Sequence, residues 1–430
     1  MSFFTVFGPS QTHFRYLIRL PSVLREFSIS TVSLPSQTSR IAEAMQQDNQ
    51  NQKERHQHQH QTGEEYYGPT AMPPKEKRAG TSVRSYSTNP AEGKKTVAVP
   101  RPSASVLVIS PQNQVLLLQR VKQSSSFPSA HVFPGGNVSE FHDGRAPEPD
   151  APGRHEDSEV YRMAAIRETF EESGILLARN NGFGRLIEVP EDQREEGRRL
   201  VHSSEVPFPK WLAQKGGRAD IDGLTPFTRW ITPTNVPKRF TTQMYIYFLP
   251  TLSSTPISEG QADSEAEVSI PSPTTDGGKE HTTARFLPAS AWCRLAQEGR
   301  IILFPPQFFL LHQVAQHFDN LRSPTDYGSI SRDPVPREEL EARRRRLVQF
   351  VKSGNPPWTD MCISPQTMPP PKKREDGKQV LALHRPGPEL KDTDRAGCTE
   401  QCVLVDFQRE GPRRLEVVSR DEALGRDAKL

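Results

Sequence analysis

Residues 159–175 constrain this chain more than any other stretch, because their sequence, EVYRMAAIRETFEESGI, combines helical periodicity with a cluster of carboxylates. Apolar side chains recur at the spacing of one helix face. Gly174 stands where a left-handed C-terminal cap is expected. Glu171 and Glu172 follow Glu168 by three and four residues, so the three carboxylates crowd one face of the last two turns. The stretch therefore predicts a helix with an acidic face.

Two interpretations of that acidic face are open. Like charges at this spacing destabilise a bare helix by roughly 0.2–0.5 kcal/mol per pair, a cost that a solvated charged face can bear. A divalent cation bridged to phosphate oxygens would reverse the cost, since Mg²⁺ and Mn²⁺ prefer hard oxygen ligands in an octahedral array. Arg167 lies beside the carboxylates and can orient one of them.

The full pattern favours the second interpretation. It resembles the Nudix box, the strand–loop–helix signature of Nudix hydrolases, whose form is G-x5-E-x7-R-E-U-x-E-E-x-G-U with U apolar. Thr169 at an apolar position is a mild departure. The resemblance implies an α/β fold, the Nudix α/β/α sandwich around a mixed β-sheet. The matching residues are Glu159, seven further residues and the run RETFEESGI at 167–175.

The sequence FPGG at 133–136 looks like the Pro-Gly-Gly loop that leads into the box in this family. Glycines there let the backbone approach a metal-bound diphosphate closely. Gly136 and Glu159 are 23 positions apart, whereas the family usually puts that glycine six before the glutamate. Gly153 fits the spacing numerically but lies in a Pro- and Gly-rich segment. We therefore interpret Gly135 and Gly136 as the functional loop and 137–157 as an insertion.

Two further segments resemble Nudix enzymes that cleave coenzyme A and its thioesters. The run FPSAHVFPGG at 127–136, followed by an insertion, is similar to theirs. The segment TPTNVPKRFTT at 232–242 is similar to an element that precedes a strand in that branch. Lys238 and Arg239 are therefore candidates for contact with an anionic nucleotide, and solvated cations at a strand end are the alternative.

The resemblance implies metal-assisted hydrolysis of a diphosphate. Carboxylates of Glu168, Glu171 and Glu172, with the carbonyl of Gly136, would hold Mg²⁺ or Mn²⁺, while Arg167 orients a carboxylate. Glu159 would anchor the loop–helix junction. The general base stays open among the box glutamates and Glu280, with His281 second, or both residues only flank a strand. A coenzyme A substrate would give 3′,5′-ADP and 4′-phosphopantetheine or its acyl form.

Two other functions remain possible. A related hydrolase can prefer ADP-ribose or a dinucleotide such as NADH, and the 127–136 run argues against it. A catalytically silent Nudix scaffold would bind nucleotides without cleaving them. Such a scaffold normally lacks box carboxylates, and here all of them are present.

Composition suggests how the chain is divided. Only 34% of its 430 residues are hydrophobic and 40 are proline, which argues for one good core with long irregular additions. We expect a disordered tail at 1–100, a Nudix domain at 101–325 with insertions at about 137–157 and 251–279, and a C-terminal extension at 326–430. Four adjacent arginines in the charged helix expected at 337–351 point all round it, which favours a solvated helix.

The apolar pattern predicts the remaining elements. Helices are expected at 190–216, where Trp211 and Leu212 pack inward, at 289–298 and after Pro305. A small β-meander is expected near the C-terminus. The predicted strands are 104–109, 115–118, 175–177, 227–232, 244–249, 280–288, 380–383, 403–407 and 415–418.

Several classes of partner are disfavoured. A net charge of +3 without a basic stripe gives no reason to invoke nucleic acid. No apolar run approaches the length of a membrane span. The four cysteines lack metal-ligand spacing, which favours free or structural thiols in a reducing compartment. We therefore expect a small-molecule nucleoside-diphosphate substrate.

Both ends of the chain resemble targeting segments. Residues 1–45 are rich in arginine and serine, as a mitochondrial presequence is, although an unstructured tail fits equally well. The closing sequence Ala428-Lys429-Leu430 differs from the Ser-Lys-Leu peroxisomal address by one small residue. A peroxisomal import receptor is thus an expected partner, and peroxisome or mitochondrion the expected location.

Overall fold

The computed structural model describes residues 97–122, 128–180, 184–251, 273–274, 281–328, 334–368 and 374–425, which all belong to one compact unit. Several predictions concern residues outside these ranges. They are the N-terminal tail up to residue 96 with its presequence-like segment, the candidate base Glu280, most of the 251–279 insertion, and the C-terminal Ala-Lys-Leu.

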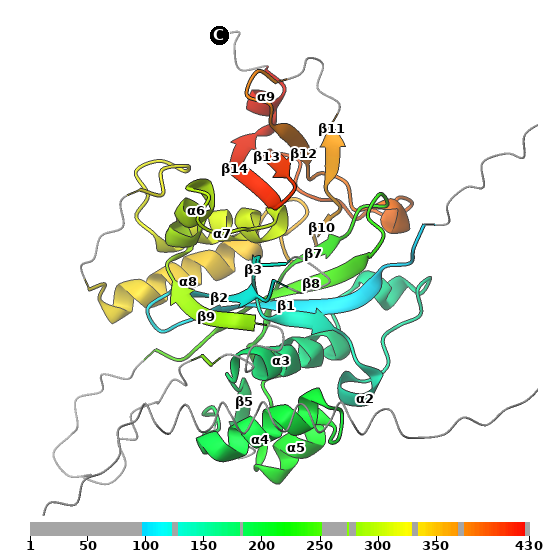
Figure 1. Cartoon of the computed structure of the whole chain (residues 1–430), viewed down its shortest axis with the longest axis vertical. Coiled ribbons are helices and arrows are strands. Elements are labelled where there is room, and N and C mark those ends of the chain that lie inside the picture. Colours follow the sequence, from blue (N-terminus) through cyan, green and yellow to red (C-terminus); the bar gives the residue numbers. More distant parts are fainter. Residues whose placement is uncertain are drawn as a thin grey trace, which may run out of the picture. The chain divides into compact units, whose positions relative to one another are not determined.

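A mixed eight-stranded sheet forms the centre of this unit (Figure 1). Its main path runs β10-β7-β8-β1-β2-β3, with β4 paired to β1 and β9 paired to β2. The neighbours β1 and β8 are parallel, whereas β1 and β2 are antiparallel, so the predicted mixed sheet is confirmed. The strands are β1 Arg101–Ile109, β2 Val115–Arg120, β3 His131–Val132, β4 Gly135–Asn137, β7 Thr225–Ile231, β8 Phe240–Phe248, β9 His281–Leu287 and β10 Cys362–Ile363.

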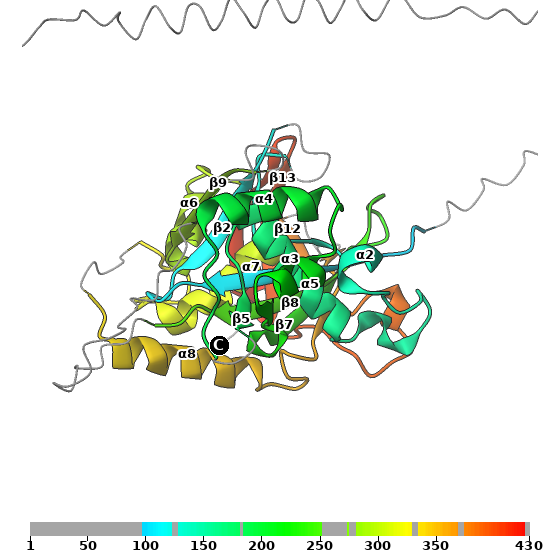
Figure 2. The same cartoon turned by 90° about the horizontal axis from the view of Figure 1, so that it is seen from below.

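Helices cover both faces of this sheet, as the predicted sandwich requires (Figures 1 and 2). Strand β1 shows why, because its side chains alternate between two buried clusters. Leu107 and Ile109 join one cluster, and Val106 and Val108 join the other. One face carries α3 Glu159–Ser173, α4 Glu191–His202 and α5 Phe208–Gln214, and the other carries α6 Ala289–Gln297, α7 Pro305–Phe318 and α8 Arg337–Val351.

Helix α3 forms where the sequence predicts it. Gly174 ends it in the left-handed region at φ 71°, and its N–H donates to the Phe170 carbonyl. Thr169, the departure from the apolar pattern, is fully buried. Its hydroxyl donates to the Ala165 carbonyl at 2.8 Å, so the polar atom is paired inside the helix. This bond explains why threonine is tolerated at an apolar position.

The region after α3 differs from prediction in two ways. Residues 190–216 form two helices, because the chain leaves α4 after His202 and restarts at α5 behind Pro207. Trp211 and Leu212 are buried as predicted. The expected strand at 175–177 is wrong, since this apolar run is buried without ladder pairing. Pairing begins only at β5 Ala178–Asn180, which meets β6 Gly217–Ala219.

The predicted C-terminal β-meander is confirmed as a four-stranded sheet in the order β11-β12-β13-β14. One of its faces shares a hydrophobic cluster with α6, α7 and the central sheet through Val403, Leu415 and Val417. In addition, β10 pairs in parallel with β7. The described residues between 334 and 425 therefore share one core with the sheet. The strands are β11 Gln366–Met368, β12 Gln379–Ala382, β13 Gln401–Gln408 and β14 Gly411–Ser419.

Helix α8 has the predicted bounds, but the expectation that its arginines are all solvated is wrong. Arg343 is 8% exposed and donates to the Phe318 carbonyl. Arg344 donates to the carbonyls of Ser110 at 2.6 Å and Leu249 at 2.8 Å. Both carbonyls lie just past the end of a strand, and that of Ser110 also accepts from the Asn113 N–H at 2.9 Å. Arg343 thus fastens α8 to the end of α7, and Arg344 fastens it to the strand ends of the sheet.

The described helices and the four cysteines bear on which class of protein this is. None of the described helices is long and apolar enough to cross a bilayer. All four cysteines are buried and free. Burial raises the pKa of Cys293, Cys362, Cys398 and Cys402, which favours the neutral thiol.

Candidate active site

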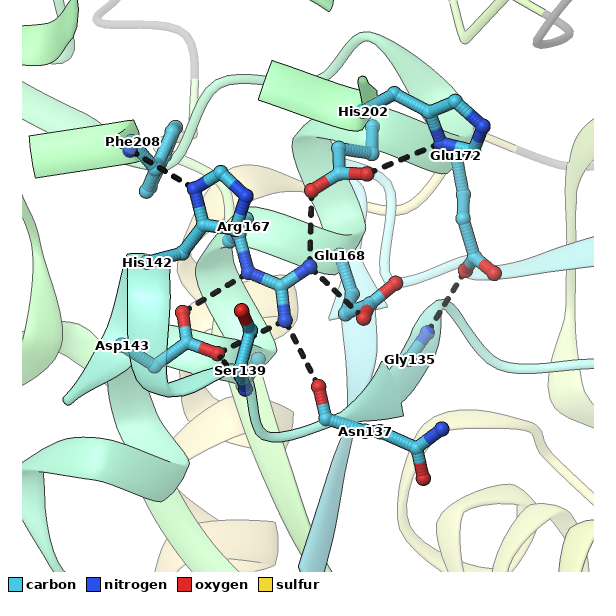
Figure 3. A network of polar contacts seen from close by, with 12 residues as sticks. Gly135, Asn137, Ser139, His142, Asp143, Arg167, Glu168, Glu172, His202 and Phe208 are labelled. Carbon is cyan, nitrogen blue, oxygen red and sulfur yellow. Dashed lines mark hydrogen bonds and ion pairs between the residues drawn. The ribbon is translucent and has the colours of Figure 1, made fainter. Parts of the chain in front are cut away.

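Arg167 is the centre of the network drawn in Figure 3, and only 4% of it is exposed. Its Nη1 donates to Glu168 Oε1 and to Glu171 Oε1, both at 2.9 Å. Its Nε and Nη2 grip the two oxygens of Asp143 at 2.9 and 2.8 Å. Nη2 also donates to the Asn137 carbonyl at 2.8 Å. These bonds use all five N–H groups of a guanidinium, so the side chain is fixed and fixes its partners.

Asp143 was not foreseen from the sequence, and its carboxylate is fully buried. It ends the short helix α2, Glu140–Asp143, inside the 137–157 insertion. Glu159, expected to anchor the loop–helix junction, instead opens α3 with an exposed side chain. That expectation is wrong, because Asp143 in the insertion pairs with Arg167 instead. The available signal was that Asp143 follows Gly136 by seven positions, close to the family's six.

Glu172 is held by the loop and by a neighbouring strand. The Gly135 N–H donates to its Oε2 at 2.8 Å (Figure 3). Its Oε1 lies 3.6 Å from His281 Nε2. Glu172 is 6% exposed and His281 is fully buried. The structure thus brings His281, the second candidate for the base, against a candidate metal ligand.

Steric contacts support the choice of glycine loop. A Cβ on Gly136 would lie 2.4 Å from Glu168 Oε1, and one on Gly135 would lie 2.3 Å from the Ala104 carbonyl oxygen. Gly135 also has φ 156°, which L side chains rarely adopt. A Cβ on Gly153 would meet only Pro147 Cγ at 3.7 Å. Gly135 is therefore required to be glycine by the backbone, a side chain at Gly136 would displace the Glu168 carboxylate, and Gly153 has room for a side chain.

The site carries more negative than positive charge. Burial raises the pKa of Glu168 to about 7, Glu171 and Asp143 add to the rise, and Arg167 opposes it. A bound cation would offset this excess, so the donor set fits Mg²⁺ or Mn²⁺. Among the described residues, however, no three acidic, histidine or cysteine side chains are already gathered around one point. The carboxylates are instead turned toward Arg167 and the Gly135 amide.

Arg239, expected to contact substrate, has a different environment. It is 3% exposed, and its Nε and Nη1 donate to the carbonyls of Thr232 at 2.9 Å and Ala98 at 2.8 Å. Nη1 also lies 2.5 Å from Glu389 Oε1. In this conformation the guanidinium is buried at the strand end, where it joins the segments that contain its three partners. The neighbouring Lys238 is exposed.

Helix α2 is itself anchored by a histidine that the sequence reading missed. His142 Nδ1 accepts from the Phe208 N–H at 3.1 Å, at the start of α5 (Figure 3). Its Nε2 lies 3.3 Å from the Ser204 hydroxyl oxygen. Burial lowers the pKa of His142, which keeps the ring neutral and Nδ1 able to accept. The contacts of His142 thereby help to fix the position of Asp143, the next residue in the chain.

Comparison with known proteins agrees with this geometry. Residues 153–314 match the family model described as the NUDT19 Nudix domain. The fold, the box helix and its fixed arginine agree with this match, so residues 153–314 resemble a Nudix hydrolase domain. The chain's resemblance to the acyl-coenzyme A diphosphatase branch of that family is likewise confirmed.

Individual relatives are modestly similar. The chain is 30% identical over 154 residues to the putative nudix hydrolase 7 of Caenorhabditis elegans, covering 36% of this chain and 46% of that protein. It is 27% identical over 248 residues to the acyl-coenzyme A diphosphatase NUDT19 of Xenopus laevis, covering 48% and 60%. The chain thus spans about half the length of these relatives. A Nudix hydrolase structure from Alicyclobacillus acidocaldarius is 21% identical, with a TM-score of 0.38, over 55% of this chain and 98% of that one.

Proposed function

We propose that this chain hydrolyses the diphosphate bond of coenzyme A or an acyl-CoA, releasing 3′,5′-ADP and 4′-phosphopantetheine or its acyl form. The observation that carries the proposal is the fixed arginine. Arg167 holds Glu168 and Glu171 on one side while the Gly135 amide holds Glu172 on the other. Three carboxylates are thus kept beside a loop that only glycine can form.

A divalent cation belongs to this proposal. Carboxylates of Glu168, Glu171 and Glu172, with the Gly136 carbonyl, would hold Mg²⁺ or Mn²⁺, which supplies charge neutralisation for a diphosphate and lowers the pKa of bound water. The carboxylates would shift to meet at the cation, while Glu168 and Glu171 keep their bonds to Arg167.

The protein's own groups have separate tasks in such a reaction. Arg167, fixed by Asp143, orients Glu168 and Glu171. The backbone at Gly136 leaves room for the Glu168 carboxylate, which a side chain would displace. His281 lies 3.6 Å from Glu172, which supports a role for it in accepting or passing a proton, and Glu280 is a further candidate base.

The coenzyme A substrate rests on two supports. The relative from Xenopus laevis is named an acyl-coenzyme A diphosphatase. The run FPSAHVFPGG at 127–136 is similar to that branch. An ADP-ribose or dinucleotide diphosphatase with the same site is the second candidate, because the carboxylate network itself recognises only a diphosphate and a cation.

Product analysis tests the proposal. The full chain is incubated with Mn²⁺ or Mg²⁺ and, in parallel, with coenzyme A, an acyl-CoA, ADP-ribose and NADH. Rapid release of 3′,5′-ADP is expected, and Glu172→Gln should abolish it while thermal unfolding stays cooperative. Glu196→Gln, an exposed glutamate on α4, is the matched control and should act as wild type. Release of AMP from ADP-ribose or NADH would overturn the proposed substrate but keep the proposed reaction. If none of the compounds is cleaved, the proposal that the chain is an enzyme is rejected.

A further inference from the structure

The end of helix α4 contacts the acidic face of α3. His202 Nδ1 lies 3.2 Å from Glu171 Oε2, while the other carboxylate oxygen accepts from Arg167 Nη1 at 2.9 Å (Figure 3). A carboxylate ion only accepts hydrogen bonds, so Nδ1 must carry the proton and donate. This holds for both the neutral and the charged imidazole. Glu171 is therefore gripped from two sides by donors on two different helices.

Helix α4 also fixes the main chain beneath Glu171. Arg198 donates from Nε at 3.1 Å and from Nη2 at 2.9 Å to the Glu171 carbonyl. Arg198 is 5% exposed, and its Nη1 donates to the Thr274 hydroxyl at 2.9 Å. The same helix thus sets the position of both the backbone and the carboxylate of Glu171. Such double support is typical of the residues that surround a metal site.

The grip leaves Glu171 able to bind a cation. Each carboxylate oxygen has two lone pairs, and Arg167 and His202 use one on each oxygen. One lone pair on each oxygen remains, with its direction set by the donors. The Glu171 side chain is 8% exposed, whereas that of His202 is 42% exposed. His202 therefore lies at the rim, where substitution removes one contact without opening the core.

We propose that His202 is a positioning residue for Glu171, which orients the carboxylate toward the divalent cation through its Nδ1–H. The inference rests on the proposed metal-dependent function and adds a residue from outside the box to it. Loss of a supporting hydrogen bond of this kind typically weakens metal affinity or activity by about 10–100-fold. Because His202 acts through Glu171, its loss should appear in metal binding before any substrate is added.

Three variants separate positioning from direct substrate contact. His202→Ala removes both ring nitrogens. His202→Asn keeps an N–H donor near the position of Nδ1 but removes the Nε2 edge that faces away from Glu171. Arg199→Ala is the control on the same helix, since Arg199 is half-exposed and pairs only with Glu196 and Glu205 among the described residues.

The experiment measures Mn²⁺ binding to the full chain without substrate, by calorimetry or electron paramagnetic resonance, followed by steady-state kinetics. We expect His202→Ala to raise the Kd for Mn²⁺ by about 10-fold, His202→Asn to bind within about two-fold of wild type, and Arg199→Ala to match wild type. The activity of His202→Ala should recover at high Mn²⁺.

Each contrary result has a distinct meaning. Unchanged Mn²⁺ affinity in His202→Ala, with an active wild type, overturns the positioning role and leaves the proposed function intact. Normal Mn²⁺ binding but a raised KM in both His202 variants overturns it in favour of substrate contact. A wild-type chain that binds no Mn²⁺ and cleaves none of the substrates overturns the proposed function and this inference together.

Discussion

Helices α3 and α8 have the same length, fifteen residues, and both are densely charged, yet their charges act differently. Glu168 and Glu171 of α3 share one cation, Arg167, with Asp143, which leaves an excess of negative charge. Arg344 on α8 donates to the backbone carbonyls of Ser110 and Leu249, which need no counter-charge. A cluster with excess negative charge can bind a cation. An arginine whose N–H groups are paired with backbone carbonyls has only the structural role of joining a helix to its neighbours. Charge density along a helix therefore does not distinguish a site from a scaffold.

The largest effect is expected at the shared cation of α3. Arg167→Lys removes the planar fork that holds Asp143, Glu168 and Glu171 together, and a lysine cannot replace it. We expect kcat to fall by about 100-fold or more, the upper range for supporting residues at a metal site. Steady-state kinetics at saturating Mn²⁺ would measure it. An activity near wild type would place Arg167 with the arginines of α8 as a structural clamp.

The second prediction compares two acidic residues near the ends of the insertion. Asp143→Asn should lower kcat by about 10-fold or more, because it weakens the paired bonds that fix Arg167. Glu159→Gln should leave kcat unchanged, since its side chain is exposed at the start of α3. The same assay decides between them. The opposite ranking would return the anchoring role to Glu159.

The third prediction concerns stability at α8. Arg344→Met leaves the Ser110 and Leu249 carbonyls and the Asn113 side chain without this donor. Hydrogen bonds to a charged group are worth about 1.5–3 kcal/mol each, so we expect a loss of about 3 kcal/mol after partial compensation by water. Urea unfolding would measure it, with the exposed Arg345→Met as a control that changes stability by less than about 0.5 kcal/mol. Lost activity at full stability would contradict a purely structural role.

The fourth prediction concerns a smaller stability effect per residue, which depends on pH and involves one histidine on each side of the sheet. Burial lowers the pKa of His155 to about 4, with Arg229, Arg154 and Arg395 acting in the same direction and Glu389 against it. Burial also lowers the pKa of His312 to about 4. Both rings are neutral in the fold, whereas the unfolded chain binds the proton first as the pH falls below about 6.5.

Stability from these two histidines is thus fully present above about pH 6.5 and is lost as the pH falls toward about 4. At pH 5 each of the two histidines should lower the free energy of unfolding by about 2 kcal/mol relative to neutral pH. Unfolding followed from pH 7.5 to 5 would show it, and His312→Gln should flatten the curve. A curve that keeps its full slope in this variant would mean that His312 titrates normally.

Elements decided by local pattern could be predicted from the sequence. The bounds of α3 and α8, the Gly174 cap and the β-meander follow from periodicity and turn residues, and the structure confirms them. The choice of Gly135 and Gly136 over Gly153 also agrees with the structure, because only the first two would clash as other residues. The single helix expected at 190–216 was wrong, since periodicity continued across a proline that starts a new helix.

Long-range partners could not be predicted in this way. Arg239 was expected at the substrate, but it fastens a strand end to Ala98 and Glu389. Arg344 was expected in solvent, but its carbonyl partners lie 95 and 234 positions away in the chain. Asp143 was missed because one extra residue shifts it from the family's spacing.

The sequence by itself determined that the chain has an acidic helix, a glycine loop before it and strands enough for a mixed sheet, because propensity and periodicity act over a few residues. Only the tertiary structure decided that Asp143 rather than Glu159 meets Arg167, that His281 faces Glu172 and that His202 meets Glu171. These pairs join residues whose separation is set by packing. A side chain's charge is written in the sequence, but the partner that gives the charge a role is chosen by the fold.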